Sequence, residues 1–258
     1  MNRQAVNPYL PSWEYIPDGE PHVFNGRVYV YGSHDRFNAP IFCVNDYVCW
    51  SAPVEDLSEW RYEGVIYRKK QDPKNPLGYH LLFAPDVCQG PDGRYYLYYA
   101  FDFLGIMSVA VCDTPAGEYK FLGHIHYADG TLWGRRRGDQ LPFDPGVLAD
   151  DDGRVWLYSG FYNAVPAILT GGHKLRCDGG TVLELEKDMV TIKTEPRVIF
   201  PKKGPGAFQG HEFFEASSIR KEGKTYIFVY SSRHNHELCY ATLSLIHISE
   251  PTRPERIS

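Results

Sequence analysis

Four acidic residues recur at similar places along the chain, and their spacing raises the question of shared chemistry. They are Asp18 in "IPDGEP", Asp86 in "FAPDV", Asp144 in "FDPGV" and Glu215 in "FFEASS". Carboxyl groups that meet at one site can give and take protons, whereas a lone acidic residue usually caps a turn. The strands and turns expected around these residues distinguish a shared site from separate turn caps.

Each acidic residue is followed by a short run, a tight turn that ends in Gly, a basic residue and a strand-like stretch rich in Tyr. The turn glycines lie 60 to 70 residues apart: Gly26, Gly93, Gly153 and Gly223. A second pair of strand-like stretches follows at 46–67, 106–125 and 180–200. Antiparallel units of four strands at a fixed period predict an all-β fold, a β-propeller. A β-sandwich is the rival all-β fold, but it does not predict a long internal repeat.

The propeller geometry favours a shared site for three of the four acidic residues. The first strand of each blade lines the central channel, so residues just before these strands converge around the axis. We therefore expect Asp18, Asp144 and Glu215 to meet, although they lie far apart in the sequence. The alternative is that each of them only caps its own turn.

The composition argues against several classes of partner. The 258 residues carry a net charge of −5, which gives no reason to expect nucleic acid or an anionic membrane. No apolar run reaches transmembrane length, and residues 1–20 do not resemble a signal peptide. The six cysteines form no C-x-x-C pair and are expected to be buried free thiols. These features predict a cytoplasmic protein.

Four segments together resemble glycoside hydrolase family 43. They are "NPYLPSWEYIPDGEP", "FAPDV", "FDPGVLADDDGRVWLYSG" and "FFEASSIRK", and the resemblance covers residues 7–242. It implies a five-bladed β-propeller that hydrolyses arabinose- and xylose-containing glycans with inversion of configuration. It also implies an oligosaccharide substrate and no required cofactor. Members of the family often hold a central ion, commonly calcium, so a structural calcium ion is an expectation for the full-length parent.

The resemblance implies a role for each acidic residue. Asp18 matches the general base, Asp144 the auxiliary aspartate and Glu215 the general acid. Asp86 matches a segment that lines the pocket and is assigned to substrate binding. Glu215 must hold its proton near neutral pH, and Asp144 is the expected anion that raises its pKa. Asp18 must stay ionised, so we expect it to be better solvated or hydrogen-bonded.

Other residues compete for these roles. Glu20 and Glu212 lie two and three residues from the assigned base and acid. Phe83 and Phe143 lie beside the acidic residues and are the preferred candidates for stacking on a sugar. The other aromatic candidates are Trp13, Phe37, Trp133 and Phe161. The "HNH" stretch at 234–236 is interpreted as a surface loop, and no metal site is assigned to the chain.

Three functions are weighed. The first is an inverting exo-acting pentosidase, either a β-xylosidase or an α-L-arabinofuranosidase; an endo-arabinanase is the nearest enzymatic alternative. The second is a non-catalytic sugar-binding propeller, which would predict the loss of one acidic residue. The third is a protein-binding propeller of the WD-repeat type, which would need shorter repeats and a Trp-Asp signature. The sequence leaves xylose or arabinose specificity and the oligomeric state open.

The end of the chain departs from the strand pattern. The stretch "LSLIHISEPTR" at 243–253 resembles the in-frame translation of a transposon end used to prepare sequencing libraries. We therefore expect residues 1–242 to form an incomplete propeller domain and residues 243–258 to be a tail that is not native. At 60–70 residues per blade, the chain then holds about three and a half of the five blades.

Overall fold

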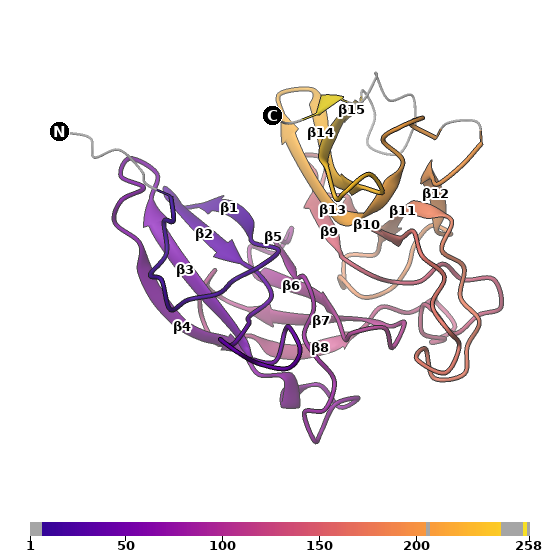
Figure 1. Cartoon of the computed structure of the whole chain (residues 1–258), viewed down its shortest axis with the longest axis horizontal. Helices are drawn as coiled ribbons and strands as arrows, with labels where there is room; N and C mark the ends of the chain where they lie inside the picture. Colours follow the sequence, from indigo (N-terminus) through magenta and orange to yellow (C-terminus); the bar gives the residue numbers. More distant parts are fainter. Residues whose placement is uncertain (1–6, 205–206, 244–254, 257–258) are drawn as a thin grey trace.

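The computed structural model describes residues 7–204, 207–243 and 255–256, and it contains four antiparallel sheets of four strands each (Figure 1). We call these sheets blades 1 to 4 in chain order. Blades 1 and 2 comprise β1 (Glu20–Phe24), β2 (Arg27–Tyr31), β3 (Tyr47–Pro53), β4 (Arg61–Tyr67), β5 (Asp86–Gln89), β6 (Tyr95–Ala100), β7 (Met107–Cys112) and β8 (Lys120–His124). Blades 3 and 4 comprise β9 (Gly146–Ala149), β10 (Val155–Phe161), β11 (Gly179–Leu185), β12 (Arg197–Pro201), β13 (Phe213–Glu222), β14 (Thr225–Ser232), β15 (Leu238–Leu243) and β16 (Glu255–Arg256). A short 3-10 helix, η1 (Lys69–Gln71), follows blade 1.

The predicted repeat corresponds to the blades. In every blade the strands pair in sequence order, so each blade is a meander. The four turn glycines connect the first and second strands, and each has a positive φ, between 59° and 83°. A positive φ suits glycine in a tight hairpin turn. The all-β propeller prediction and the period of four strands are therefore confirmed.

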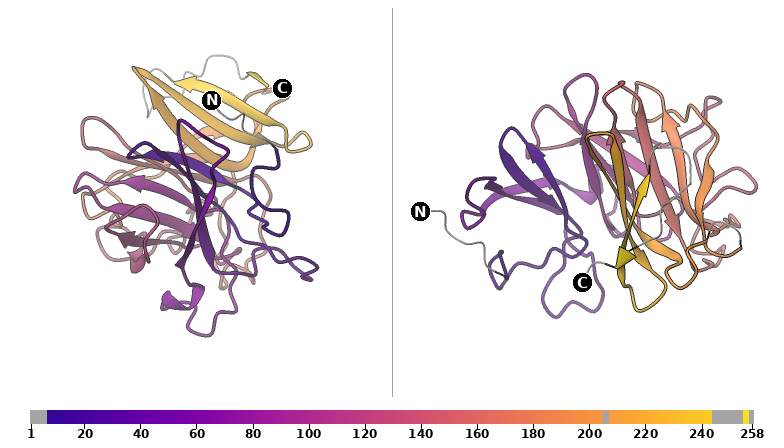
Figure 2. Two further views of the ribbon diagram at one scale, coloured as in Figure 1. Left: turned by 90° about the vertical axis from the view of Figure 1, so that its left-hand side faces the viewer. Right: turned by 90° about the horizontal axis from the view of Figure 1, so that it is seen from above.

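Buried aromatic and aliphatic side chains join successive blades. One apolar cluster lies between blades 1 and 2, a second between blades 2 and 3, and a third between blades 3 and 4. Large side chains fill them, including the fully buried Tyr31, Trp133 and Phe228. Figure 2 shows the blades following one another around a common axis. Burial of this apolar surface fixes the angle between neighbouring blades.

Blades 1 and 4 meet through polar groups instead. Among the described residues, no apolar cluster contains strand residues of both blades; Cys43 of the β2–β3 connection and Phe214 of β13 belong to one cluster beside the cavity. Glu20 of β1 accepts hydrogen bonds from Ser218 Oγ, at 2.8 Å, and from the Arg220 guanidinium of β13. Arg220 also donates to the Pro21 carbonyl at 2.8 Å.

The fourth blade contains the boundary of the expected tail. Strands β13 to β15 form three quarters of this blade, and the two residues of β16 pair with Cys239 and Tyr240. Residues 244–254 and 257–258 lie outside the described residues, so the non-native origin of residues 243–258 stays a prediction. Among the residues that are described, no helix has the length and apolar character needed to cross a membrane.

Candidate active site

A cavity of about 300 Å³ opens where the inner strands of the blades begin. It contains the three acidic residues that the sequence predicts to converge: Asp18 from blade 1, Asp144 from blade 3 and Glu215 from blade 4. Its lining consists of Pro17, Asp18, Asp35, Phe42, Cys43, Phe83, Ala84, Phe103, Phe143, Asp144, Phe161 and Glu215. None of these described residues is basic. The volume lies at the lower end of the range for small-molecule sites.

The backbone holds two of these carboxyl groups in the same unusual way. Asp18 and Asp144 each lie two residues before the first strand of their blade, and their φ angles are 56° and 48°. Non-glycine residues rarely adopt this left-handed conformation, although Asp tolerates it better than most. Such conformations cluster at functional sites, where the surrounding structure holds them in place.

An irregularity in the backbone of β13 orients the side chain of Glu215. The register of β13 against β14 shifts on both sides of Glu215, and Ala216 has a φ of 62°. An irregularity of this kind re-aims a side chain at the end of a sheet. The Ala216 amide then donates a hydrogen bond of 3.1 Å to Asp144 Oδ2, which ties the third acidic residue to the second. Blades 3 and 4 approach closely here, since a Cβ on Gly146 would lie 2.5 Å from the Ser217 carbonyl.

The site raises the pKa of all three carboxyl groups. Burial and, second, the charge of Asp18 raise the pKa of Glu215 to about 7. Burial raises the pKa of Asp144 well above its usual value, and the charges of Glu215 and Asp18 add to that effect. Burial also raises the pKa of Asp18, with a smaller contribution from Asp35, while a 2.9 Å hydrogen bond from Ser33 Oγ opposes the rise. Burial and mutual repulsion therefore favour the protonated forms of these groups.

The anion expected beside Glu215 stays a prediction. Asp144 is 7% exposed, and burial followed by the charge of Glu215 raises its pKa, so these two neighbouring carboxyl groups disfavour each other's ionisation. Burial and the charge of Asp18 raise the pKa of Glu215. Asp18 is hydrogen-bonded, as its expected role as base requires, but burial partly opposes its ionisation.

Asp86 does not line the cavity, which departs from the substrate-binding role assigned to it. It is the first residue of β5, as Glu20 is of β1, and so lies two residues further along its blade than Asp18 and Asp144. The position that does line the cavity in blade 2 is Ala84. Two residues along a strand are about 7 Å, which places Asp86 deeper in the channel.

The contacts of Asp86 explain why it is fully buried. His22 Nε2 lies 2.6 Å from Oδ1, and the Val87 amide donates to the same oxygen at 2.7 Å. The Val147 amide of β9 donates to Oδ2 at 2.6 Å. Asp86 therefore joins the inner strands of blades 1, 2 and 3.

Phenylalanines form the apolar wall of the cavity. Phe83 and Phe143, the preferred stacking candidates, pack edge to face with ring centroids 5.8 Å apart. Phe103 lies parallel to Phe143 at 5.3 Å, and Phe161 contacts Phe143 at 4.9 Å. Phe83 and Phe143 are largely buried by their neighbours, so each presents only part of its ring to the cavity. Of the other aromatic candidates, Trp133 is fully buried in the core between blades 2 and 3, and Trp13 and Phe37 are exposed.

Comparison with known proteins decides the family. Residues 17–249 match the model of "Glycosyl hydrolases family 43". The chain belongs to glycosyl hydrolases family 43. A "Xylosidase/arabinosidase" of Thermoclostridium stercorarium is 61% identical over 246 residues, which cover 94% of this chain and 50% of that protein. A "Xylosidase/arabinosidase" of Bacteroides ovatus is 31% identical over 91% of this chain and 75% of its own length.

Solved structures agree with this membership in family 43. The chain matches a "GH43 beta-xylosidase/alpha-arabinofuranosidase from a compost microbial metagenome", solved with xylotriose in a calcium-free form, with a TM-score of 0.69 and 26% identity. That match covers 98% of this chain and 80% of the other. A GH43_1 enzyme from Xanthomonas citri matches with a TM-score of 0.69 at 24% identity, covering 95% of this chain and 74% of the other, which supports the fold. The chain spans only about half the length of the Thermoclostridium relative.

The competing acidic residues of this family 43 chain lie outside the cavity. Glu20 is bound by Ser218 and Arg220, as described above. Glu212 lies 3.2 Å from His234 Nε2 and 3.8 Å from the Arg233 guanidinium. Both have basic partners; among the described residues, the acidic residues of the cavity have one basic contact, from His236 Nδ1 to Glu215 Oε1 at 3.5 Å.

Sequence reasoning missed two polar residues of the cavity. Asp35 and Cys43 lie in the connection between β2 and β3 of blade 1, outside the motif that recurs in every blade. Burial raises the pKa of the Cys43 thiol to about 12. Since the repeat was the source of the site prediction, residues outside it carried no signal.

The described residues do not form a calcium site by themselves. Glu20, His22 and Asp86 come together near the axis. Their oxygens already accept hydrogen bonds from N–H and O–H groups, as given above for Glu20 and Asp86. Calcium takes six to eight oxygen ligands, which this set does not provide. No chemical step is therefore assigned to an ion there.

Proposed function

We propose that the full-length protein is an inverting exo-acting pentosidase, a β-xylosidase or an α-L-arabinofuranosidase. The observation that carries the proposal is the meeting of Asp18, Asp144 and Glu215 from three blades in one cavity. Family membership and the xylosidase/arabinosidase relatives support it.

The proposed reaction divides the work between two carboxyl groups. Glu215, with a pKa near 7, gives its proton to the glycosidic oxygen as the bond to the anomeric carbon breaks. Asp18 takes a proton from the water that attacks the anomeric carbon from the opposite face. The product sugar then has the inverted configuration.

Asp144 is a positioning residue in this proposal. It accepts the Ala216 amide at 3.1 Å and so holds the backbone next to Glu215. The phenylalanine wall excludes water from one side of the cavity and supports the raised pKa of the acidic residues. These contacts set the protonation state of the site before substrate arrives.

The first experiment uses the full-length protein, recovered from its source DNA, beside the 258-residue chain. Hydrolysis of p-nitrophenyl β-D-xyloside, p-nitrophenyl α-L-arabinofuranoside and xylobiose is measured, and proton NMR follows the anomer first released. We expect turnover of at least one glycoside with the inverted anomer. Glu215→Gln should slow xylobiose about 10²- to 10⁴-fold. The aryl glycosides should slow less, because p-nitrophenolate leaves without a proton.

Glu212→Gln is the matched control, since it removes a carboxyl group three residues away that has basic partners. It should keep the wild-type rate. A folded full-length protein that hydrolyses none of these substrates would contradict the exo-acting proposal, and cleavage of linear arabinan would then identify an endo-acting enzyme. Release of the retained anomer would contradict the division of roles between Glu215 and Asp18.

A further inference from the structure

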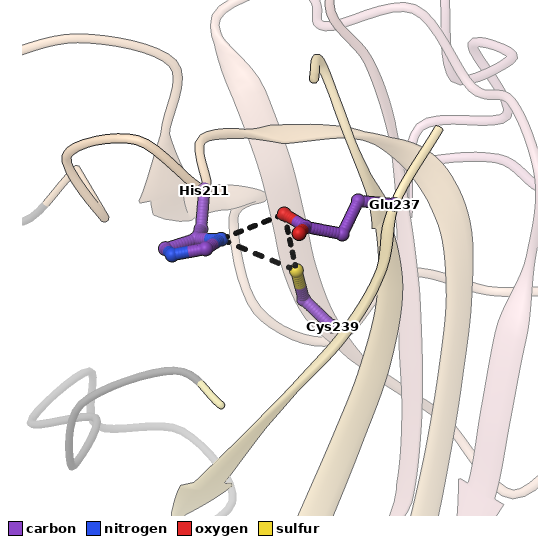
Figure 3. Close-up of side chains that lie close together, drawn as sticks. All are labelled: His211, Glu237 and Cys239. Atoms are coloured by element: carbon purple, nitrogen blue, oxygen red, sulfur yellow. Dashed lines mark hydrogen bonds and ion pairs between the residues drawn. The ribbon is translucent and has the colours of Figure 1, made fainter. Parts of the chain in front are cut away.

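Three side chains of different chemistry meet at one point of blade 4, outside the acidic cavity. His211 lies in the segment before β13, Glu237 directly precedes β15 and Cys239 is the second residue of β15. Figure 3 shows the three side chains pointing toward one another. Glu237 and Cys239 are two residues apart, so both face the same side of the strand.

Their separations match those of ligands around one metal ion. Glu237 Oε2 lies 2.8 Å from His211 Nδ1, and Cys239 Sγ lies 3.7 Å from each of these atoms. With zinc bond lengths of about 2.0 Å to N and O and 2.3 Å to S, tetrahedral ligands lie about 3.3–3.6 Å apart. Shifts of a few tenths of an ångström would therefore bring the three atoms into the first shell of one ion.

A catalytic triad does not explain the arrangement. In a triad the imidazole uses one nitrogen for the nucleophile and the other for the carboxylate. Here the thiol and the carboxylate both face Nδ1 of His211. Cys239 is also fully buried, so a substrate cannot reach its sulfur.

We propose that His211, Glu237 and Cys239 form a binding site for a divalent transition metal ion, with Zn²⁺ as the expected occupant. One imidazole nitrogen, one carboxylate oxygen and one thiolate are a donor set that suits zinc, with water in the fourth position. The site is separate from glycoside hydrolysis and does not depend on it.

The surroundings hold the three ligands in place. The Tyr230 hydroxyl donates a hydrogen bond of 2.7 Å to the His211 carbonyl. The Ser232 amide donates to the Glu237 carbonyl at 2.8 Å, which closes the 233–237 loop. The same loop carries His236, whose Nδ1 lies 3.5 Å from Glu215 Oε1 in the cavity. A bound ion would tie this loop to the segment before β13.

The test uses the 258-residue chain, stripped with EDTA and titrated with CoCl₂ and then ZnCl₂. We expect one Co²⁺ per chain, with a thiolate-to-cobalt band in the near ultraviolet and the visible bands of a tetrahedral ion, both displaced by Zn²⁺. Loss of a residue that only hydrogen-bonds a metal ligand weakens metal binding about 10- to 100-fold. Loss of a ligand itself should therefore weaken the affinity at least that much. Cys239→Ser should also abolish the near-ultraviolet band, and Zn²⁺ should raise the melting temperature of the wild type but not that of Cys239→Ser.

Two control variants have no place in the cluster. Cys112→Ser removes a less buried thiol on β7, and His173→Gln removes a surface imidazole; both should bind like the wild type. If circular dichroism shows that Cys239→Ser does not fold, the titration is repeated with Glu237→Gln, which changes a ligand at the edge of the cluster. The same loss of metal affinity is expected for that variant. Absence of cobalt bands in the wild type, or equal losses in the Cys112→Ser control, would overturn the proposal.

Discussion

Two layers of carboxyl groups lie along the inner strands, and they differ in their partners. The cavity layer contains Asp18, Asp144 and Glu215, with no basic residue among the described residues of the lining. The axis layer contains Glu20 and Asp86, whose oxygens accept from imidazole, guanidinium, hydroxyl and amide groups. The axis layer joins blades, whereas the cavity layer holds strained backbone and raised pKa values. Acidic groups in a cavity whose pKa values are raised by burial and by one another are candidates for proton transfer.

The largest expected effect is the loss of turnover when the cavity layer loses its base. Asp18→Asn in the full-length protein should lower kcat about 10²- to 10⁴-fold on either p-nitrophenyl glycoside, because it removes the carboxylate that is proposed to activate water. The loss should persist on these activated substrates, unlike that of Glu215→Gln. Glu20→Gln, two residues away in the axis layer, is the matched comparison and should keep more than a tenth of the wild-type kcat. An equal loss of kcat in Asp18→Asn and Glu20→Gln would contradict the functional difference between the two layers.

The next effect concerns stability and the axis layer. Asp86→Ala leaves His22 and the amides of Val87 and Val147 without their acceptor. Because these groups are buried, we expect the free energy of unfolding to fall by about 2–4 kcal/mol. Urea denaturation of the chain measures it, and Asp152→Ala in an exposed turn should change it by less than about 0.5 kcal/mol. If Asp86→Ala changed the free energy of unfolding as little as Asp152→Ala does, the role of Asp86 in joining the blades would be contradicted.

The smallest effect is the pH dependence that the cavity layer imposes on stability. The pKa of Glu215 is raised from 4.5 to about 7, so the folded state binds more protons than the unfolded state between these values. Its contribution to stability is therefore present below pH 4.5 and is lost as the pH rises through 7. Glu215→Gln should match the wild type near pH 4 and exceed it by about 1–3 kcal/mol at pH 8. Urea denaturation at both pH values measures the difference in the free energy of unfolding between the variant and the wild type. A difference that does not grow with pH would contradict the raised pKa.

The blades could be predicted from the sequence because their signals are local. A glycine after each first strand, alternating apolar residues and a period of 60–70 residues act over short stretches of chain. The fold class and the convergence of Asp18, Asp144 and Glu215 on one cavity followed from this repeat. The origin of residues 243–258 stays a prediction, since most of them lie outside the described residues.

Depth in the channel and contacts between blades were decided by the tertiary structure. Asp86 resembles Asp18 in its motif, but a two-residue difference in where the strand begins moves it from the cavity layer to the axis layer. Asp35 and Cys43 reach the cavity through the β2–β3 connection, which lies outside the recurring motif. His211 meets Glu237 and Cys239 only because β13, β14 and β15 pair side by side. Sequence periodicity specifies which face of a strand a residue occupies. The packing of one blade against the next specifies its neighbours, and those neighbours set its charge.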